Sequence, residues 1–190
     1  RGQGAYADAT VRHVLDMEVG IDFSEIYDDP RSDIRQFAYA SGMRVVPDGV
    51  AAYDCLYDYL PTLHKRGEHG HDFHYVTANS EVLGWVIEHV TETPIVRLFG
   101  ERIYEQIGAE RDAFYMTDPC GKAIAGGGMC VTAADMLRLA LLVANDGVWN
   151  DTHIVPPSAI GRLKAGGTPR PSLWGNEGGP SETFTPFVRI

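Results

Sequence analysis

The sequence predicts a mainly α-helical chain, because its clearest patterns are helical. One helical face follows Thr77, where apolar side chains recur at spacings of one and four: Val82, Leu83, Val86, Ile87 and Val90. A second face lies in residues 133–146 and consists of Met136, Leu139, Ala140 and Val143. Thr77 or Asn79 is suited to cap the first helix with a side-chain oxygen. The pair Thr132-x-x-Asp135 resembles a capping box that begins the second helix, and Gly147 ends it.

Three further helices are expected over residues 11–20, 47–66 and 95–108. Thr10 is a suitable N-cap for the first of them, and Gly20 ends it. Pro61 should kink the second or end it early. Thr93-Pro94 places a capping residue and a proline at the start of the third, which Gly108 ends.

The remaining stretches lack a clear period and suggest a boundary near the C-terminus. Residues 34–49 have mixed character. Residues 166–190 are rich in Gly, Pro, Ser and Thr, which indicates irregular structure. We therefore divide the chain into a helical domain of residues 1–165 and an irregular C-terminal segment of residues 166–190.

The composition indicates a globular chain and excludes some partners. The chain has 190 residues, of which 44% are hydrophobic, and this is enough for one domain with a core. The formal net charge of −10 argues against nucleic acid as a partner. No apolar run is long enough for a membrane span, so we expect no membrane partner. No secretion signal is visible, and we expect a cytoplasmic rather than a periplasmic protein.

The cysteines are three in number and widely spaced: Cys55, Cys120 and Cys130. An odd number at such spacing predicts neither a disulfide framework nor a zinc site. We interpret them as buried free thiols, which fits a reducing compartment.

The stretch F-H-Y-V-T-A-N-S-E-V-L-G, residues 73–84, carries the main candidate for chemistry. Tyr75 lies just before the expected helix, where the positive end of the helix dipole favours phenolate character. Such a phenol could act as a general base. The structural alternative is a packing tyrosine whose hydroxyl bonds to backbone.

The pattern F-x-Y-x-x-x-N-x-x-x-L-G resembles the second conserved motif of the serine β-lactamase and penicillin-binding superfamily. The resemblance is to the branch of class C β-lactamases, family VIII carboxylesterases and 6-aminohexanoate-dimer hydrolases. It places Tyr75 at the position of a tyrosine that helps to deprotonate a nucleophilic serine. Thr77 takes the position of an asparagine that contacts substrate, and threonine lacks the paired donor and acceptor of that amide.

Two further stretches resemble the same family. Residues 10–30, T-V-R-H-V-L-D-M-E-V-G-I-D-F-S-E-I-Y-D-D-P, are similar to the segment that follows the nucleophile-bearing helix. Within that stretch the resemblance places Tyr27 on a loop that borders the substrate cleft. Residues 126–139, G-G-G-M-C-V-T-A-A-D-M-L-R-L, resemble a Gly-Gly turn that leads into a helix. The resemblance covers residues 4–165.

Two motifs of this superfamily are absent from the sequence. None of Lys65, Lys122 and Lys164 has a serine three residues earlier, so there is no Ser-x-x-Lys nucleophile motif. The third motif, Lys-Thr-Gly or His-x-Gly, is also absent. The resemblance therefore implies the helical lobe of an α/β β-lactamase-like fold with most of the antiparallel sheet missing. It also predicts an exposed apolar surface and, through it, self-association.

Other chemistry-bearing patterns have simpler interpretations. His69, His71 and His74 do not match a known metal-ligand spacing, so we expect a variant turn and no metal. The acidic turn at Asp28-Asp29 and the glycines of residues 126–128 also indicate turns rather than ligand sites. We expect no cofactor.

Two functional hypotheses follow. In the first, the chain is part of a serine hydrolase that acts on a small-molecule amide or ester, and the serine and lysine lie outside it. In the second, it is a non-catalytic binding or scaffolding domain that reuses the fold. The sequence does not choose among β-lactam, ester and linear amide substrates.

Overall fold

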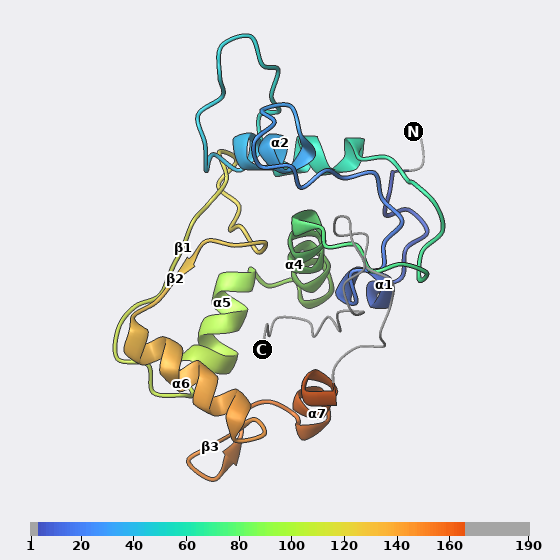
Figure 1. Ribbon diagram of the computed structural model, residues 1–190. Coiled ribbons are helices and arrows are strands. Elements are labelled where there is room, and N and C mark those ends of the chain that lie inside the picture. The colour runs from blue at the N-terminus through green and yellow to red at the C-terminus, as the bar shows by residue number, and fades with distance from the viewer. Residues whose placement is uncertain (1–3, 166–190) are drawn as a thin grey trace.

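The computed structural model describes residues 4–165, and helices dominate this part of the chain (Figure 1). The helices are α1 (Val11–Leu15), α2 (Asp33–Ala40), α3 (Leu56–Tyr59), the 3-10 turn η1 (Leu60–Thr62), α4 (Thr77–Thr91), α5 (Ile95–Phe99), the π-helical turn η2 (Gly100–Tyr104), α6 (Ala133–Ala144) and α7 (Pro157–Ala165). The strands form two antiparallel pairs, β1 (Phe114–Tyr115) with β2 (Met129–Cys130) and β3 (Val148–Trp149) with β4 (Thr152–His153). The mainly α prediction, with little sheet, is confirmed. The predicted irregular segment 166–190 lies outside the described residues.

Helix α4 lies at the centre of the fold, between α1 and α5 (Figure 1). The main hydrophobic core surrounds its first half and includes Phe37, Leu56, Leu60, Val76 and Leu83. A smaller core lies around Tyr104, Ile107 and Leu142, towards α6 and the β3–β4 hairpin. The two cores divide the described chain into an end that carries α2 and α3 and an end that carries α6.

The segment after α1 pairs with the segment before α4. An antiparallel bridge joins Ile21 to Lys65, and the amide of His74 donates to the carbonyl of Met17 at 2.8 Å. Gly20 permits this approach, because a Cβ at position 20 would lie 2.7 Å from the carbonyl oxygen of Glu68. The pairing places residues 73–77 beside residues that are about 50 positions earlier in the chain.

Glu81 attaches the glycine turn of residues 126–128 to α4. Its carboxylate is buried and accepts hydrogen bonds from the amides of Ala125 and Gly126 at 2.8 and 3.0 Å. It also accepts one from Nε1 of Trp85 at 3.1 Å. Burial raises the pKa of Glu81, although the three N–H donors oppose that shift. The role of this turn is therefore structural, as the sequence indicated.

Helix α6 begins where the sequence predicts, because the side chain of Thr132 accepts from the amide of Asp135 at 3.1 Å. Its buried face is only partly the predicted one, however, although Leu139 packs against the smaller core as expected. Met136 is 49% exposed, whereas Asp135 and Leu142 are buried. Asp135 can be buried because its carboxylate accepts from the hydroxyl of Thr132 and from the amide of Glu110. Apolar periodicity alone could not identify a charged residue as the inward-facing one.

Several predicted boundaries are wrong. Residues 47–66 are helical only in α3 and η1, and Pro61 lies at the start of η1. Helix α1 ends at Leu15, well before Gly20, because Met17 adopts a φ of 57° that no α-helix continues through. Helix α2 was not predicted at all, although its residues Ile34, Phe37 and Ala40 face the core.

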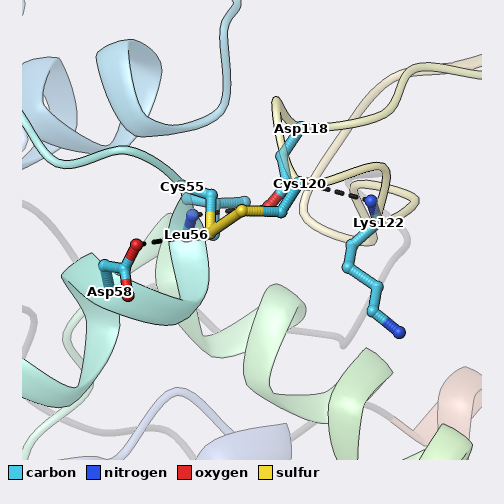
Figure 2. Close-up of a disulfide and its surroundings, with 6 residues drawn as sticks. All are labelled: Cys55, Leu56, Asp58, Asp118, Cys120 and Lys122. Atoms are coloured by element: carbon cyan, nitrogen blue, oxygen red, sulfur yellow. Dashed lines mark hydrogen bonds between the residues drawn. A yellow bond between two sulfur atoms is a disulfide. The ribbon is translucent and has the colours of Figure 1, made fainter.

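The prediction of three free thiols is also wrong. Cys55 and Cys120 form a disulfide across 65 positions of sequence (Figure 2). Cys130 is free and exposed. Asp118 holds the two segments together, since its carboxylate accepts from the amides of Leu56 at 3.4 Å and Lys122 at 2.9 Å. This pairing depends on tertiary structure, so the spacing of the cysteines could not reveal it.

The described residues contain no helix that is long and apolar enough to cross a membrane.

Candidate functional site

The three site residues predicted from sequence come from two segments that meet at the start of α4. Tyr75 and Thr77 flank Val76, the residue that precedes the helix, and Tyr27 lies on the loop between α1 and α2. A fourth residue, Glu25, lies between them and was not predicted. It contacts Thr77 on one side and Tyr27 on the other.

Glu25 supplies the cap that α4 lacks. The N-cap residue is Val76, whose side chain has no acceptor, and no capping hydrogen bond comes from it. Instead, Oε1 of Glu25 accepts from both the amide and the hydroxyl of Thr77, each at 2.8 Å. A carboxylate in this place also lies at the positive end of the helix dipole. The predicted caps, Thr77 and Asn79, therefore do not serve as caps; Thr77 is the first residue of the helix.

Tyr27 donates its hydroxyl proton to the other oxygen of the same carboxylate, Oε2 of Glu25, at 2.9 Å. The phenol is 51% exposed. Burial of the remaining surface, the bond to Glu25 and the proximity of Tyr75 together raise the pKa of Tyr27 to about 12. Tyr27 is thus a neutral phenol at physiological pH and is not suited to act as a base. Because Tyr75 acts electrostatically on the pKa of Tyr27, the two phenols lie near each other.

The loop that carries Glu25 is held at its base. The amide of Ser24 donates to Oδ2 of Asp33 at 2.9 Å, and the amide of Ile34 donates to the carbonyl of Ser24 at 3.0 Å. The hydroxyl of Tyr59, from α3, also donates to the Asp33 carboxylate, at 3.2 Å. These bonds fix the backbone one residue before Glu25, which limits the positions its side chain can reach.

Tyr75 is half-buried between two buried neighbours, Phe73 and Val76. Beneath the same turn lies Asn79, whose side chain is fully buried and accepts from the hydroxyl of Tyr6 at 2.9 Å. Its amide nitrogen donates to the sulfur of Met17 at 3.2 Å. The turn that carries Tyr75 and Thr77 is therefore supported from below by a satisfied polar contact between α4 and the N-terminal segment.

The acidic turn next to Tyr27 is structural. Oδ1 of Asp29 accepts from the amide of Arg31, and the carbonyl of Asp29 accepts from the hydroxyl of Ser32. Beside this turn is an open cavity of about 360 Å³, and the residues that line it are Asp28, Pro30, Arg35, Tyr39, Arg44, Val45 and Pro47. The lining includes Asp28, the residue that follows Tyr27, and Arg35, whose charge acts on that phenol.

The histidine-rich loop has a structural role too. Nδ1 of His69 accepts from the amide of Gly20 at 3.0 Å, which leaves Nε2 as the ring's donor. That Nε2 faces Oδ1 of Asp8 at 3.1 Å, and Lys65 pairs with the same carboxylate. Lys65 and His69 lower the pKa of Asp8 to about 2. Within residues 4–165, no group of three His, Cys, Asp or Glu side chains is placed to hold a metal ion.

The arrangement at the start of α4 consists of two phenols, one hydroxyl and one carboxylate. Such groups can accept, donate and relay protons. The carboxylate engages both predicted substrate-binding residues. Glu25 was missed because it lies 52 positions from Thr77 and belongs to no local motif. Its only sequence signal was its place inside the family-like stretch of residues 10–30.

Comparisons with known proteins agree with this architecture. The β-lactamase family profile matches residues 1–172. The 6-aminohexanoate-dimer hydrolase of Paenarthrobacter ureafaciens is 33% identical over 163 residues, which cover 86% of this chain and 41% of that enzyme. The chain therefore spans about two fifths of the length of this curated relative.

Solved structures give the same result. A Bacillus anthracis protein assigned as a 6-aminohexanoate-dimer hydrolase superposes with a TM-score of 0.75 at 29% identity, over 84% of this chain and 42% of that one. EstCE1, a hydrolase with promiscuous acyltransferase activity, superposes with a TM-score of 0.56 at 17% identity, over 85% of this chain and 53% of its own. The latter similarity concerns the fold alone. Together the matches confirm the resemblance in the sequence motifs and a partial form of that fold.

Proposed function

Because this chain belongs to the β-lactamase family, we propose that it forms part of a serine hydrolase that cleaves an amide or ester bond. The observation that carries this proposal is the meeting of Tyr75, Thr77 and Tyr27 at the start of α4, where Glu25 joins the last two. A cluster of hydroxyl groups on a supported turn is suited to proton transfer and substrate contact.

The proposed reaction proceeds through an acyl-enzyme. A serine outside this chain, activated by a lysine one helical turn later, attacks the substrate carbonyl carbon. Tyr75 passes the serine proton to the leaving nitrogen or oxygen as the bond to the carbonyl carbon breaks. Water then attacks the acyl ester, and the serine leaves with a proton as the acid is released. Tyr75 is the proposed catalytic residue of this chain.

Tyr27 and Thr77 are the proposed substrate-binding residues. Tyr27 is exposed enough to contact a small molecule, and the cavity of about 360 Å³ is lined by the next residue, Asp28. The relative from Paenarthrobacter is named for a linear amide dimer. A linear amide is therefore the first substrate to test, with esters and β-lactams as alternatives.

A fluorophosphonate probe, read by intact mass, tests the proposal. The probe reacts with activated serines, and we expect it to label a chain extended upstream but not the 190-residue chain. In the extended chain, Tyr75→Phe should reduce amide hydrolysis by at least about a hundredfold, since proton transfer by a positioned side chain contributes roughly 10²–10⁴-fold. Full activity of the phenylalanine variant would remove Tyr75 from the mechanism. Labelling of the 190-residue chain would place the nucleophile at one of its own serines.

A second candidate function is a non-catalytic binding or scaffolding domain. It is favoured by the absence of Ser-x-x-Lys from the 190 residues and by Thr77 in the family's asparagine position. This alternative predicts no labelling of either chain. It also predicts that the extended chain binds a linear amide without cleaving it.

A further inference from the structure

We propose that Glu25 is a positioning residue that turns the hydroxyl groups of Thr77 and Tyr27 into hydrogen-bond acceptors and so selects a substrate group that donates an N–H. This inference rests on the proposed function only where it concerns catalysis. The arrangement of the three side chains can be tested in the 190-residue chain by itself.

One oxygen of Glu25 holds the side chain of Thr77 in a fixed position. Oε1 of Glu25 accepts from the amide and from the hydroxyl of this one residue, both at 2.8 Å. Two bonds from one residue to one oxygen fix the side-chain rotamer of Thr77 relative to its own backbone. A hydroxyl has one proton and two lone pairs, and the proton is committed to Glu25. The lone pairs remain, so Thr77 can only accept from a ligand.

The other oxygen of Glu25 engages the hydroxyl proton of Tyr27 in the same way. The phenolic oxygen lies 2.9 Å from Oε2 of Glu25 and donates its proton to that oxygen. Burial together with this bond raises the pKa of Tyr27 to about 12. The phenol therefore keeps its proton near neutral pH, and that proton is engaged. What Tyr27 offers to a ligand is again an oxygen lone pair.

The resulting site presents hydrogen-bond acceptors to a ligand. Both carboxylate oxygens of Glu25 accept hydrogen bonds from the protein, and these bonds hold the carboxylate in place. The hydroxyl oxygens of Thr77 and Tyr27 beside it also present lone pairs, and so they too act as acceptors. An amide N–H or an ammonium group of a ligand finds acceptors here, whereas the oxygen of an ester finds no donor from Thr77 or Tyr27. The site accordingly favours a linear amide or amine-bearing substrate over the matching ester.

Glutamine at position 25 is the informative substitution. Its amide oxygen can still accept from Thr77 and cap α4, while its amide nitrogen can only donate. Tyr27 would then have to accept from position 25, and its proton would turn outward. Glu25→Gln should thus keep the fold but reverse the polarity of Tyr27. Glu101→Gln is a matched control, because Glu101 is an exposed partner of Arg97 far from this site in sequence.

The test that is independent of activity is NMR of the 190-residue chain with 13Cζ-labelled tyrosine, with Tyr27 assigned by Tyr27→Phe. We expect the pKa of Tyr27 to fall below its parent value of about 12 in Glu25→Gln, because the hydrogen bond to the carboxylate and its charge are lost while the larger contribution of burial remains. The amide proton of Thr77 should lie downfield in the parent and in Glu101→Gln, and should move upfield in Glu25→Gln as the charge-assisted bond is lost. An unchanged Tyr27 titration and an unchanged Thr77 amide shift would overturn the proposal.

The catalytic consequence is measured on the extended chain with an amide and an ester of identical skeleton. The ratio of kcat/KM for the amide to that for the ester should fall roughly tenfold in Glu25→Gln, the size of effect expected for a hydrogen bond to a charged site. The fall should appear in kcat as well as in KM, because the N–H that distinguishes the amide from the ester is on the leaving nitrogen itself. An unchanged ratio with the expected NMR shifts would overturn the substrate selection alone. If the extended chain hydrolyses neither compound, the proposed function fails, and the NMR arm still decides the role of Glu25.

Discussion

Gly84 of α4 lies so close to Ala125 that no side chain fits between them. A Cβ at position 84 would be 2.4 Å from the Cβ of Ala125, well inside contact distance. Ala125 cannot easily withdraw, because its amide donates to the buried carboxylate of Glu81. The Leu-Gly pair that closes the motif of residues 73–84 therefore has a physical reason: it lets the turn before residue 126 pack on α4 about two helical turns after Thr77.

Gly84→Ala should consequently destabilise the protein. Alanine favours a helix over glycine by about 1 kcal/mol. A forced overlap in a packed core costs about 1–3 kcal/mol, and the short Ala125 distance puts the cost at the upper end of that range. We expect a net loss of about 1–2 kcal/mol in the free energy of unfolding, measured by urea denaturation.

Two further variants test this explanation. Ala125→Gly should rescue Gly84→Ala, since it removes the atom that the new methyl group meets. Gly161→Ala in α7 is the control, because a Cβ there meets nothing within 4 Å, and this variant should gain about 1 kcal/mol from helix propensity. If the double variant is no more stable than Gly84→Ala, the overlap with Ala125 is not the cause.

The disulfide between Cys55 and Cys120 makes a second prediction. Closing a loop across 65 positions stabilises a protein by about 4 kcal/mol in the chain-entropy description. A reductant, or the double variant Cys55→Ser/Cys120→Ser, should therefore lower the midpoint of thermal unfolding markedly. Thiol titration of the denatured, unreduced protein should find one free thiol, that of Cys130. A count of three would restore the free-thiol interpretation of the sequence.

Local signals in the sequence identified the ends of several elements. Thr132 begins α6 through its own side chain, and Gly108 follows the helical segment with a φ of 64° that favours glycine. Thr77 was predicted as a cap, one position from its actual place as the first residue of α4. Each of these features depends on residues within one turn of each other, which is the range over which sequence patterns carry information.

Features that depend on distant residues were not predictable in this way. Glu25 caps a helix that begins 52 positions later, and Cys55 finds Cys120 only because the chain folds back. Asp135 is buried because it meets the amide of Glu110. In each case a polar group is satisfied by a partner from another part of the chain, and no periodicity records that partner. The candidate site was located from family motifs, but the residue that joins two of its members was not.

The contacts of Asp8 predict a pH dependence. Lys65 and His69 lower its pKa from 3.8 to about 2. Between these two values the unfolded chain binds a proton that the folded chain does not, so this interaction stabilises the fold above pH 3.8 and is lost as the pH falls towards 2. Asp8→Asn should make the free energy of unfolding less dependent on pH in this window, measured by urea titrations at successive pH values. Asp22→Asn, which removes another exposed pair, is the control, and an equal effect of the two variants would contradict the assignment to Asp8.

The apolar face of α4 predicts self-association of the 190-residue chain. The face was expected from sequence to be buried along its whole length, and it is buried at Leu83. Further along the same stripe, however, Ile87 is 39% exposed and Val90 is 74% exposed. A stripe that continues past the core is suited to contact another surface, either a second copy or a part of the fold outside this chain.

We expect sedimentation velocity to show a concentration-dependent dimer of the 190-residue chain, and Val90→Lys to shift it to monomer because burying an unpaired ammonium group is costly. Val45→Lys is the matched control, since Val45 is 91% exposed on the loop between α2 and α3 and lies on no helical face. A chain extended upstream should be monomeric if the missing part of the fold covers the stripe, and should still dimerise if a second copy does. If the parent chain is monomeric at all concentrations, the exposed end of this face does not bind a second copy of the chain.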